Sequence, residues 1–307
     1  MGKKVTTIID ADLCTGCGLC VNVCPDDTIE IIDGNGVVTG KRCLACGHCA
    51  AICPTRAIRV GDIDPESLVF SSFTLDQDWL APGKFALSDL VRLMASRRSC
   101  RNYSDAPVTK EILADLVKIG VTAPSGTNSQ CWTFTIFSQR DEVVAMGNHI
   151  ALFFEKLNRL AVNPLLRFLT GIIGKPALSN YYRRHYQSVK NSLRLWKEDG
   201  RDQLFHGATA AILIGSRPGA SCPAEDALLA SQNILLAAHA MGLGTCLIGF
   251  AVEAIARDPK LKKKLHLPND EKIYAVIGLG YPKEPYRRLA GRKKTEVRFP
   301  SLLQVAR

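Results

Sequence analysis

Residues 14–25 read Cys14-Thr-Gly-Cys17-Gly-Leu-Cys20-Val-Asn-Val-Cys24-Pro25, and residues 43–54 repeat the pattern as Cys43-Leu-Ala-Cys46-Gly-His-Cys49-Ala-Ala-Ile-Cys53-Pro54. Each cysteine of the first stretch has a counterpart 29 residues later. A short run of alternating apolar residues follows each stretch, at 28–32 and at 57–60, and Asp33-Gly34-Asn35-Gly36 has the composition of a turn between the halves. These features predict one small module built from two similar halves.

The spacing of these eight cysteines is typical of iron–sulfur cluster ligation. Three cysteines spaced by two residues place three thiolates on one side of a cluster, and a remote cysteine followed by proline supplies the fourth. In two-cluster modules of this kind, the remote cysteine ligates the other cluster. The sequence therefore predicts two 4Fe-4S clusters, one held by Cys14, Cys17, Cys20 and Cys53 and the other by Cys24, Cys43, Cys46 and Cys49.

Two zinc sites are the alternative interpretation, because each half carries the four cysteines that a structural zinc ion needs. The three-residue gap before the fourth cysteine, the proline after it and the repetition of the whole pattern favour clusters. On these motifs, residues 5–60 resemble a bacterial-type ferredoxin with two 4Fe-4S clusters.

Composition and length indicate an ordinary globular protein with room for more than one domain. The chain has 307 residues, of which 47% are hydrophobic and 22% are charged. The first residues lack the apolar core of a signal peptide, and no run approaches the ~18 apolar residues that span a bilayer. We expect a cytoplasmic protein with no transmembrane segment, in which cysteines bind metal rather than form disulfides.

The net charge of +10 is unevenly distributed. Residues 1–60 hold six basic and six acidic side chains, so residues 61–307 carry the whole excess, with 33 basic against 23 acidic. No nucleic-acid-binding motif accompanies this charge, and no nucleic-acid partner is expected. An anionic cofactor and an acidic electron-donor protein account for it better.

The chain divides by pattern into a module over 1–60, a linker over 61–84 and a larger domain over 85–307. The linker segment has no sustained period and contains two prolines. The larger domain is predicted to mix α and β structure, with helices dominant. Its expected elements are helices near Ser88, over 109–120, through 150–200 and over 224–241, and strands over 132–137, 211–214 and 273–277.

Three segments of the larger domain indicate a phosphate and a planar ring. Ser96-Arg97-Arg98-Ser99-Cys100-Arg101 offers guanidinium forks that suit a phosphate, although a solvated basic helix end would look similar. Residues 123–132 form a polar loop that could face a cofactor or be only a loop, and residues 241–249 form a small-residue turn that would admit a flat ring. No GxGxxG motif follows a strand, which argues against a Rossmann NAD(P) domain.

Together with Gly280-Tyr281-Pro282, and in this order, these segments resemble the nitroreductase family of FMN enzymes over roughly residues 85–307. The resemblance implies an α+β fold and a homodimer with FMN at each subunit interface. The fold class expected is therefore α+β, with a small ferredoxin-like two-cluster domain followed by a nitroreductase-like FMN domain. The implied FMN contacts near the phosphate and ribityl chain are Arg97, Ser99 and Arg101, with Arg98 contributing its backbone. The resemblance also implies flavin contacts from the partner subunit by Pro124, Ser125, Gly126 and Asn128, and contacts beside the ring by Ile248 and Gly249. Arg292 is the implied late phosphate contact, with Lys293 or Lys294 as substitutes.

Two departures from the family pattern stand out. Cys131 occupies the position before Trp132 where the family usually has proline. Residues 150–200 have no clear family counterpart, and we expect this helical insertion to cap a substrate pocket, to form dimer-interface helices or to make an amphipathic membrane contact.

These expectations define an oxidoreductase that passes electrons through two 4Fe-4S clusters to FMN and on to an electrophilic small acceptor, such as a nitroaromatic, a quinone or an activated alkene. The electron donor would be a ferredoxin-like protein or NAD(P)H, and the fused module favours ferredoxin. No side chain is assigned a catalytic role. The alternatives are an electron-transfer adaptor for a partner enzyme and a specialised pathway reductase or dehalogenase.

Overall fold

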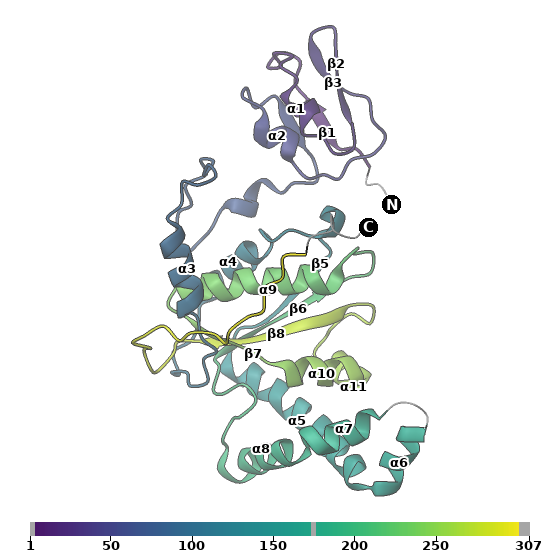
Figure 1. Cartoon of the computed structure of the whole chain (residues 1–307), viewed down its shortest axis with the longest axis vertical. Helices are drawn as coiled ribbons and strands as arrows, with labels where there is room; N and C mark the ends of the chain where they lie inside the picture. The colour runs from purple at the N-terminus through teal and green to yellow at the C-terminus, as the bar shows by residue number, and fades with distance from the viewer. Residues whose placement is uncertain (1–3, 173–175, 301–307) are drawn as a thin grey trace.

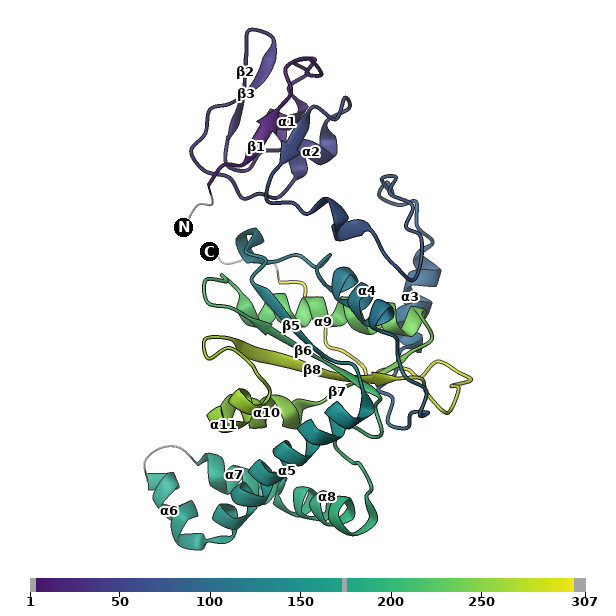
Figure 2. The ribbon, with the colours of Figure 1, turned by 180° about the vertical axis from the view of Figure 1, so that it is seen from behind.

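The computed structural model describes residues 4–172 and 176–300, so parts of the expected domains, at 1–3, 173–175 and 301–307, lie outside the described residues. The cysteine-rich segment lies at one end of the molecule, a four-stranded sheet lies in the middle, and helices α6–α8 lie at the other end (Figure 1). The view from behind shows the same three tiers (Figure 2).

The cysteine-rich segment has two similar halves. Strand β1 (Thr7–Ile9) pairs antiparallel with β4 (Ile58–Val60), and β2 (Ile29–Ile32) forms a hairpin with β3 (Asn35–Val38). Helices α1 (Leu19–Asn22) and α2 (His48–Ile52) each carry the third cysteine of one half. Asp33 and Gly34 both adopt positive φ at the hairpin turn, the conformation that a two-residue type I′ turn requires.

The stretch from 61 to 84 contains a single short helical element, the 3-10 helix η1 (Pro65–Leu68). Its N-cap is Asp64, whose side chain accepts a hydrogen bond from the Glu66 amide. Helix α4 (Lys110–Gly120) of the larger domain binds residues 66–72 of this stretch through Asp115 and Lys118.

An antiparallel sheet in the order β5-β6-β8-β7 forms the centre of the larger domain. Its strands are β5 (Trp132–Phe137), β6 (Ala210–Ser216), β7 (Gly244–Leu247) and β8 (Lys272–Gly280). The strands predicted at 132–137, 211–214 and 273–277 correspond to β5, β6 and β8. Every residue of β6 is buried, because helices cover both faces of the sheet.

Helices α3 (Leu87–Ser96), α4 (Lys110–Gly120) and α9 (Pro223–Ala240) lie on one side of the sheet, and α5 (Arg140–Val162), α10 (Gly249–Arg257) and α11 (Pro259–Lys264) lie on the other (Figures 1 and 2). The predicted Thr109 N-cap of α4 is confirmed, since its hydroxyl accepts a hydrogen bond from the Ile112 amide. Gly242, at φ 78°, ends α9 as expected. Helices α6 (Pro164–Ile172), α7 (Ala177–Arg184) and α8 (Tyr186–Asp199), with most of α5, form the helical insertion predicted at 150–200.

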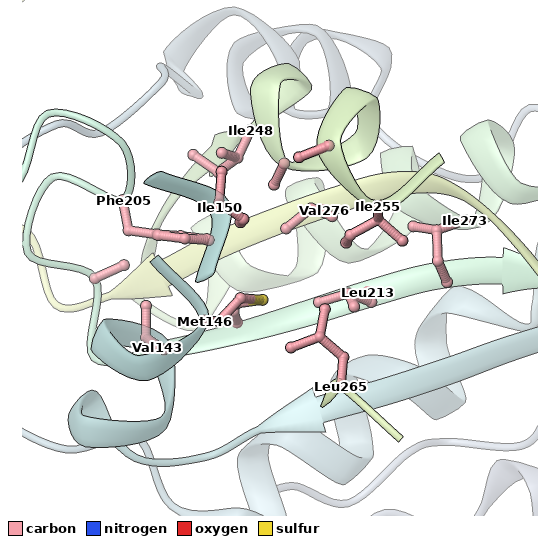
Figure 3. Close-up of a cluster of buried hydrophobic side chains, with 14 of the residues drawn as sticks. Val143, Met146, Ile150, Phe205, Leu213, Ile248, Ile255, Leu265, Ile273 and Val276 are labelled. Atoms are coloured by element: carbon pink, nitrogen blue, oxygen red, sulfur yellow. The ribbon is translucent and has the colours of Figure 1, made fainter. Parts of the chain in front are cut away.

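The two faces of β6 pack into two separate cores. Ala211 and Leu213 point into the first, together with side chains of α5 and α10, and Figure 3 shows this core between the sheet and these helices. Ile212 and Ile214 point into the second, beneath α4 and α9. The period-2 alternation of one strand thus joins both helical layers to the sheet.

The expectation of a small-residue turn over 241–249 was wrong. Residues Gly244–Leu247 form strand β7, paired with β8, and α10 begins at Gly249. The glycine is needed for packing here, since a Cβ on Gly244 would lie 2.7 Å from the Cβ of Cys100. In the described ranges, no helix has the length and hydropathy needed to cross a membrane.

Candidate cofactor sites

Eight cysteines of the N-terminal segment gather around two small cavities. One cavity is lined by Cys14, Cys17, Cys20 and Cys53, and the other by Cys24, Cys43, Cys46 and Cys49. These are the two sets predicted from the repeat, with the fourth cysteine of each set supplied by the opposite half. Within residues 4–172 and 176–300, no group of three His, Cys, Asp or Glu side chains is close enough to hold a single metal ion.

Backbone amides donate hydrogen bonds to four of the sulfurs, each over 3.3 Å. Thr28 donates to Cys24, and Ala57, its counterpart in the repeat, donates to Cys53. Gly36 donates to Cys14, and Ala45 donates to Cys43. Such bonds stabilise negative charge on sulfur and help to set the reduction potential of a cluster.

The pKa shifts of the cysteines follow the same two-fold pattern. Burial raises the pKa of the Cys20 and Cys49 thiols, on the two short helices. Burial also tends to raise the pKa of the Cys24 and Cys53 thiols. Hydrogen bonds from the side chains of Thr28 and Thr55 and from nearby amides outweigh this effect, so the pKa of both thiols lies below its usual value. In both halves of the repeat, the remote cysteine is therefore the one whose thiol pKa is lowered.

Two glycines allow the cysteine loops to fold closely. Gly16 adopts φ 65°, and a Cβ there would lie 2.1 Å from the Gly34 carbonyl oxygen. Gly47 adopts φ 75°, and a Cβ there would lie 2.6 Å from Ile63. A side chain at Gly16 would clash with backbone and displace the loop, whereas at Gly47 the strain of a positive φ is the main obstacle to a side chain.

The arginine-rich segment after α3 lines a third cavity. Arg97 and Arg98 face residues 242–245 and His239 across it. Cys100 donates its amide to Thr245 over 2.9 Å, and Ser99 forms an isolated bridge with the same residue, so the segment is tied to β7. Burial and the nearby Arg97 lower the pKa of His239, which favours the neutral imidazole.

Other predicted flavin residues occupy different positions. Arg101 lines a separate, larger cavity with Phe250, Phe154 and His206, whereas the Ile248 side chain is buried in the first core. Gly249 is exposed at the start of α10. These three predicted contacts therefore lie near the start of α10 and are not among the residues that line the arginine cavity.

The late basic contact predicted at Arg292 is not among the residues that line the arginine cavity. Arg292 donates instead to the carbonyls of Ala290 and Gly291. Arg287 and Arg288, five and six residues after Pro282, do line the cavity. Sequence reasoning overlooked them, although their position directly after the Gly280-Tyr281-Pro282 motif was a signal.

The polar loop at 123–131 lies at the other end of α9. Gly126 and Ser129 donate to the carboxylate of Asp226, in the first turn of that helix, over 2.9 and 3.2 Å. Thr127, Asn128 and Gln130 all adopt positive φ, which is costly for residues other than glycine and is concentrated at functional loops. Pro124 is exposed, and Ser125 accepts a hydrogen bond from the Gln130 amide.

Asn128 also contacts the cysteine-rich segment, which the sequence did not indicate. Its side-chain amide donates to the carbonyl oxygens of Leu44, over 2.9 Å, and Ala45, over 3.0 Å. These two residues lie between Cys43 and Cys46, so the loop abuts one of the two cysteine cavities.

Two family models match the chain. The model described as "Nitroreductase family" matches residues 94–281, and the one described as "4Fe-4S dicluster domain" matches residues 6–54. A solved nitroreductase with bound FMN from Desulfitobacterium hafniense DCB-2 has a TM-score of 0.50 at 21% identity, covering 69% of this chain and 100% of that one. Another with bound FMN, from Bacteroides fragilis NCTC 9343, has a TM-score of 0.50 at 16% identity, covering 69% and 99%.

Characterised relatives have similar identities. A 4-nitrobenzoate reductase from Nocardioides sp. (strain LMS-CY) is 24% identical over 212 residues, 64% of this chain and 81% of that protein. Iodotyrosine deiodinase 1 from Rattus norvegicus is 24% identical over 196 residues, 63% of this chain and 62% of that protein. The matches confirm the predicted α+β fold with a ferredoxin-like segment before it. The first family model covers more than half of the chain, so the chain belongs to the nitroreductase family of oxidoreductases.

Proposed function

We propose that this protein takes up electrons one at a time at two 4Fe-4S clusters and delivers them through FMN to an electrophilic small acceptor. The observation that carries the proposal is that one chain combines two cavities, each lined by four cysteines, with a third cavity lined by several arginines. Clusters carry single electrons, and FMN exchanges either single electrons or pairs, so together they link a one-electron donor to two-electron chemistry.

The cysteine sets hold the clusters in this proposal. Cys14, Cys17, Cys20 and Cys53 bind one, and Cys24, Cys43, Cys46 and Cys49 bind the other. The four N–H···S hydrogen bonds reduce the negative charge that each cluster presents and so favour its reduced state. The buried side chain of Ile58 lines the first of these cavities and that of Ile29 lines the second.

Arg97 and Arg98 bind the FMN phosphate in this proposal, with Arg287 and Arg288 completing a basic cavity. Guanidinium groups suit a phosphate dianion because each can bind it in a bidentate fork. His239 lines the same cavity and offers a further hydrogen-bonding group to the phosphate. Ser99, Arg101, Ile248 and Gly249 remain proposed contacts to the ribityl chain and ring.

We infer that two copies of the chain complete each flavin site. The arginine cavity lies at the C-terminal end of α9, with His239, and the 123–131 loop lies at its N-terminal end, with Asp226. His239 is thirteen residues further along the chain than Asp226, which corresponds to about 20 Å of helix. A single flavin cannot contact both the arginine cavity and the 123–131 loop of one chain. Two copies packed antiparallel along α9 bring the arginine cavity of one copy next to the 123–131 loop of the other.

The surface of this layer supports a dimer. Leu228 and Leu229 of α9 are 50% and 45% exposed, and Leu87 and Val91 of α3 are 70% and 53% exposed. A row of large apolar side chains on neighbouring helices is typical of a surface that another protein covers. A second copy of the chain is the occupant that the divided flavin site requires.

The acceptor is proposed to be an aromatic or other flat electrophile. The cavity beside Arg101 is lined by Phe154, Trp196 and Phe250, which suit a ring, and Arg101 would attract a negatively charged substituent. Helices α5 and α8 form most of its wall, so the 150–200 insertion serves as the cap of a substrate pocket. Reductive dehalogenation is a second candidate, favoured by the likeness to an iodotyrosine deiodinase.

Steady-state turnover with two kinds of donor tests the proposal. Reconstituted protein with measured iron, sulfide and FMN contents is supplied with a nitroaromatic acceptor and, in separate cuvettes, with reduced ferredoxin or with NADH and NADPH. We expect turnover with reduced ferredoxin. Turnover with the nicotinamides alone, together with none from ferredoxin, would overturn the proposed direction of electron flow and favour an adaptor that passes electrons outward.

A further inference from the structure

The 123–131 loop is bonded to the segment that carries two cluster ligands. Asn128 donates to the carbonyls of Leu44 and Ala45, and Ala45 in turn donates its amide to the Cys43 sulfur over 3.3 Å. A path of hydrogen bonds therefore runs from the loop to a sulfur of the cavity lined by Cys24, Cys43, Cys46 and Cys49. The path therefore links the loop to this cavity rather than to the one lined by Cys14, Cys17, Cys20 and Cys53.

A second attachment fixes the orientation of the cysteine-rich segment. Helix α4 binds the connecting stretch through Asp115, which accepts from the amides of Ser71 and Ser72, and through Lys118, which donates to the carbonyls of Glu66 and Val69. Asp115 is only 1% exposed. Attachment at two separated places, the 123–131 loop and α4, restrains rotation of the segment about either one.

The segment is thereby held near the loop end of α9. The loop is bonded to Asp226 in the first turn of the helix, whereas Arg97 and Arg98 share their cavity with His239 in the last turn. The arginines of the same chain are thus about 20 Å farther along the helix. Electron tunnelling slows steeply with distance, so the flavin bound at the loop is the favoured recipient.

We propose that electrons cross between subunits: the cluster bound by Cys24, Cys43, Cys46 and Cys49 of one copy reduces the FMN whose phosphate is bound by Arg97 and Arg98 of the other copy. This inference rests on the proposed function and its two-copy flavin site. Two electrons arrive singly from two molecules of a reduced one-electron donor protein, each of which is oxidised once. With one proton from solvent they convert oxidised FMN to its reduced anion. The cluster bound by Cys14, Cys17, Cys20 and Cys53 lies on the donor side of this path.

Mixed dimers of differently tagged chains test the crossing. One lesion, Cys46→Ser, disables the cluster beside the loop, and the other, Arg97→Ala with Arg98→Ala, removes FMN from the phosphate half-site. Placing the lesions on opposite chains leaves one flavin whose loop-side cluster is intact. Placing both lesions on the same chain leaves one flavin whose loop-side cluster is disabled.

Anaerobic stopped-flow reduction by reduced ferredoxin reports the result as the rate of flavin bleaching per bound FMN. We expect the wild-type fast phase with the lesions on opposite chains and loss of that phase with both on the same chain. The reverse order, or equal rates in the two arrangements, would overturn the crossing. A slow wild-type dimer would instead contradict the proposed function itself, and failure to form mixed dimers with bound FMN would contradict the two-copy site.

Flavin fluorescence of the oxidised mixed dimers gives a readout that needs no turnover. A cluster absorbs broadly across the visible range, so it quenches a flavin that lies close to it. We expect quenched flavin with the lesions on opposite chains and stronger emission with both lesions on the same chain. Equal emission in the two arrangements would contradict the proximity on which the proposal depends.

Discussion

The carboxylate of Asp115 accepts hydrogen bonds from both the amide and the hydroxyl of Ser72, over 2.7 and 2.6 Å, and it is almost completely buried. It also accepts from the Ser71 amide. A buried carboxylate that is satisfied by three donors from one surface stretch acts as an anchor, because losing it leaves all three donors unpaired. The anchored stretch connects the cysteine-rich segment to the larger domain.

Replacing this anchor should release the connecting stretch. For Asp115→Ala we expect the local free energy of opening at Ser71 and Ser72 to fall by about 2 to 3 kcal/mol, the range for hydrogen bonds to a charged group. Hydrogen–deuterium exchange at these amides measures the change, and Asp105→Ala, at an exposed carboxylate near the start of α4, is the control. Unchanged exchange in Asp115→Ala would show that the anchor contributes nothing.

The same anchor should weaken in acid. Burial tends to raise the pKa of Asp115, but the bonds from Ser72 and Ser71 lower it below its ordinary value of 3.8. A carboxylate whose folded pKa is depressed stabilises the folded state above the unfolded pKa, and this contribution is lost as pH falls through the folded value. As pH falls below about 3.8, protection of the Ser72 amide from exchange should therefore decrease more in the wild type than in Asp115→Ala. Parallel pH profiles would exclude the carboxylate as the cause.

Gly244 should control flavin binding through packing alone. A Cβ at this position would lie 2.7 Å from the Cβ and 2.8 Å from the sulfur of Cys100, so Gly244→Ala must push the arginine segment away from β7. We expect weaker FMN binding in titrations of the apoprotein and a loss of stability of about 1 to 3 kcal/mol. Gly171→Ala, where the added methyl meets nothing within 4 Å, is the matched control. Wild-type FMN affinity in Gly244→Ala would refute the packing argument.

Cys17 and Cys222 are both exposed cysteines and offer a matched pair. Cys17→Ser should lower the iron and sulfide content and abolish turnover driven by reduced ferredoxin, while the FMN content stays unchanged, because the flavin cavity lies in the other part of the chain. Cys222→Ser should alter none of these quantities. Ferredoxin-driven turnover that survives in Cys17→Ser would remove the cysteine module from the electron path.

The sequence predicted best those features that depend on local spacing. The repeat of Cys14–Cys24 at Cys43–Cys53 predicted which four cysteines would surround each cavity, because the remote ligand in such modules always crosses over. The long helices and the three strands of 132–137, 211–214 and 273–277 also appeared in the apolar pattern, since each buries a regular face.

Features that depend on tertiary contact were missed. Strand β7 is short and rich in small residues, so its pattern resembled a turn until β8 paired with it. The contact of Asn128 with Leu44 uses backbone carbonyls as acceptors, and any residue at position 44 would supply one. The role of Asp115 depends on a surface stretch more than 40 residues earlier in the chain, which local sequence patterns cannot indicate.

The order in which the cofactors are reduced tests the central claim most directly. Fully loaded protein is mixed anaerobically with reduced ferredoxin in a stopped-flow instrument, and the cluster and flavin absorbance bands are followed together in the wild type and in Cys46→Ser. We predict that the cluster band bleaches first and the flavin band follows, and that Cys46→Ser keeps its FMN but loses the fast flavin phase. Flavin that bleaches before the clusters, or equally fast in Cys46→Ser, would contradict the account.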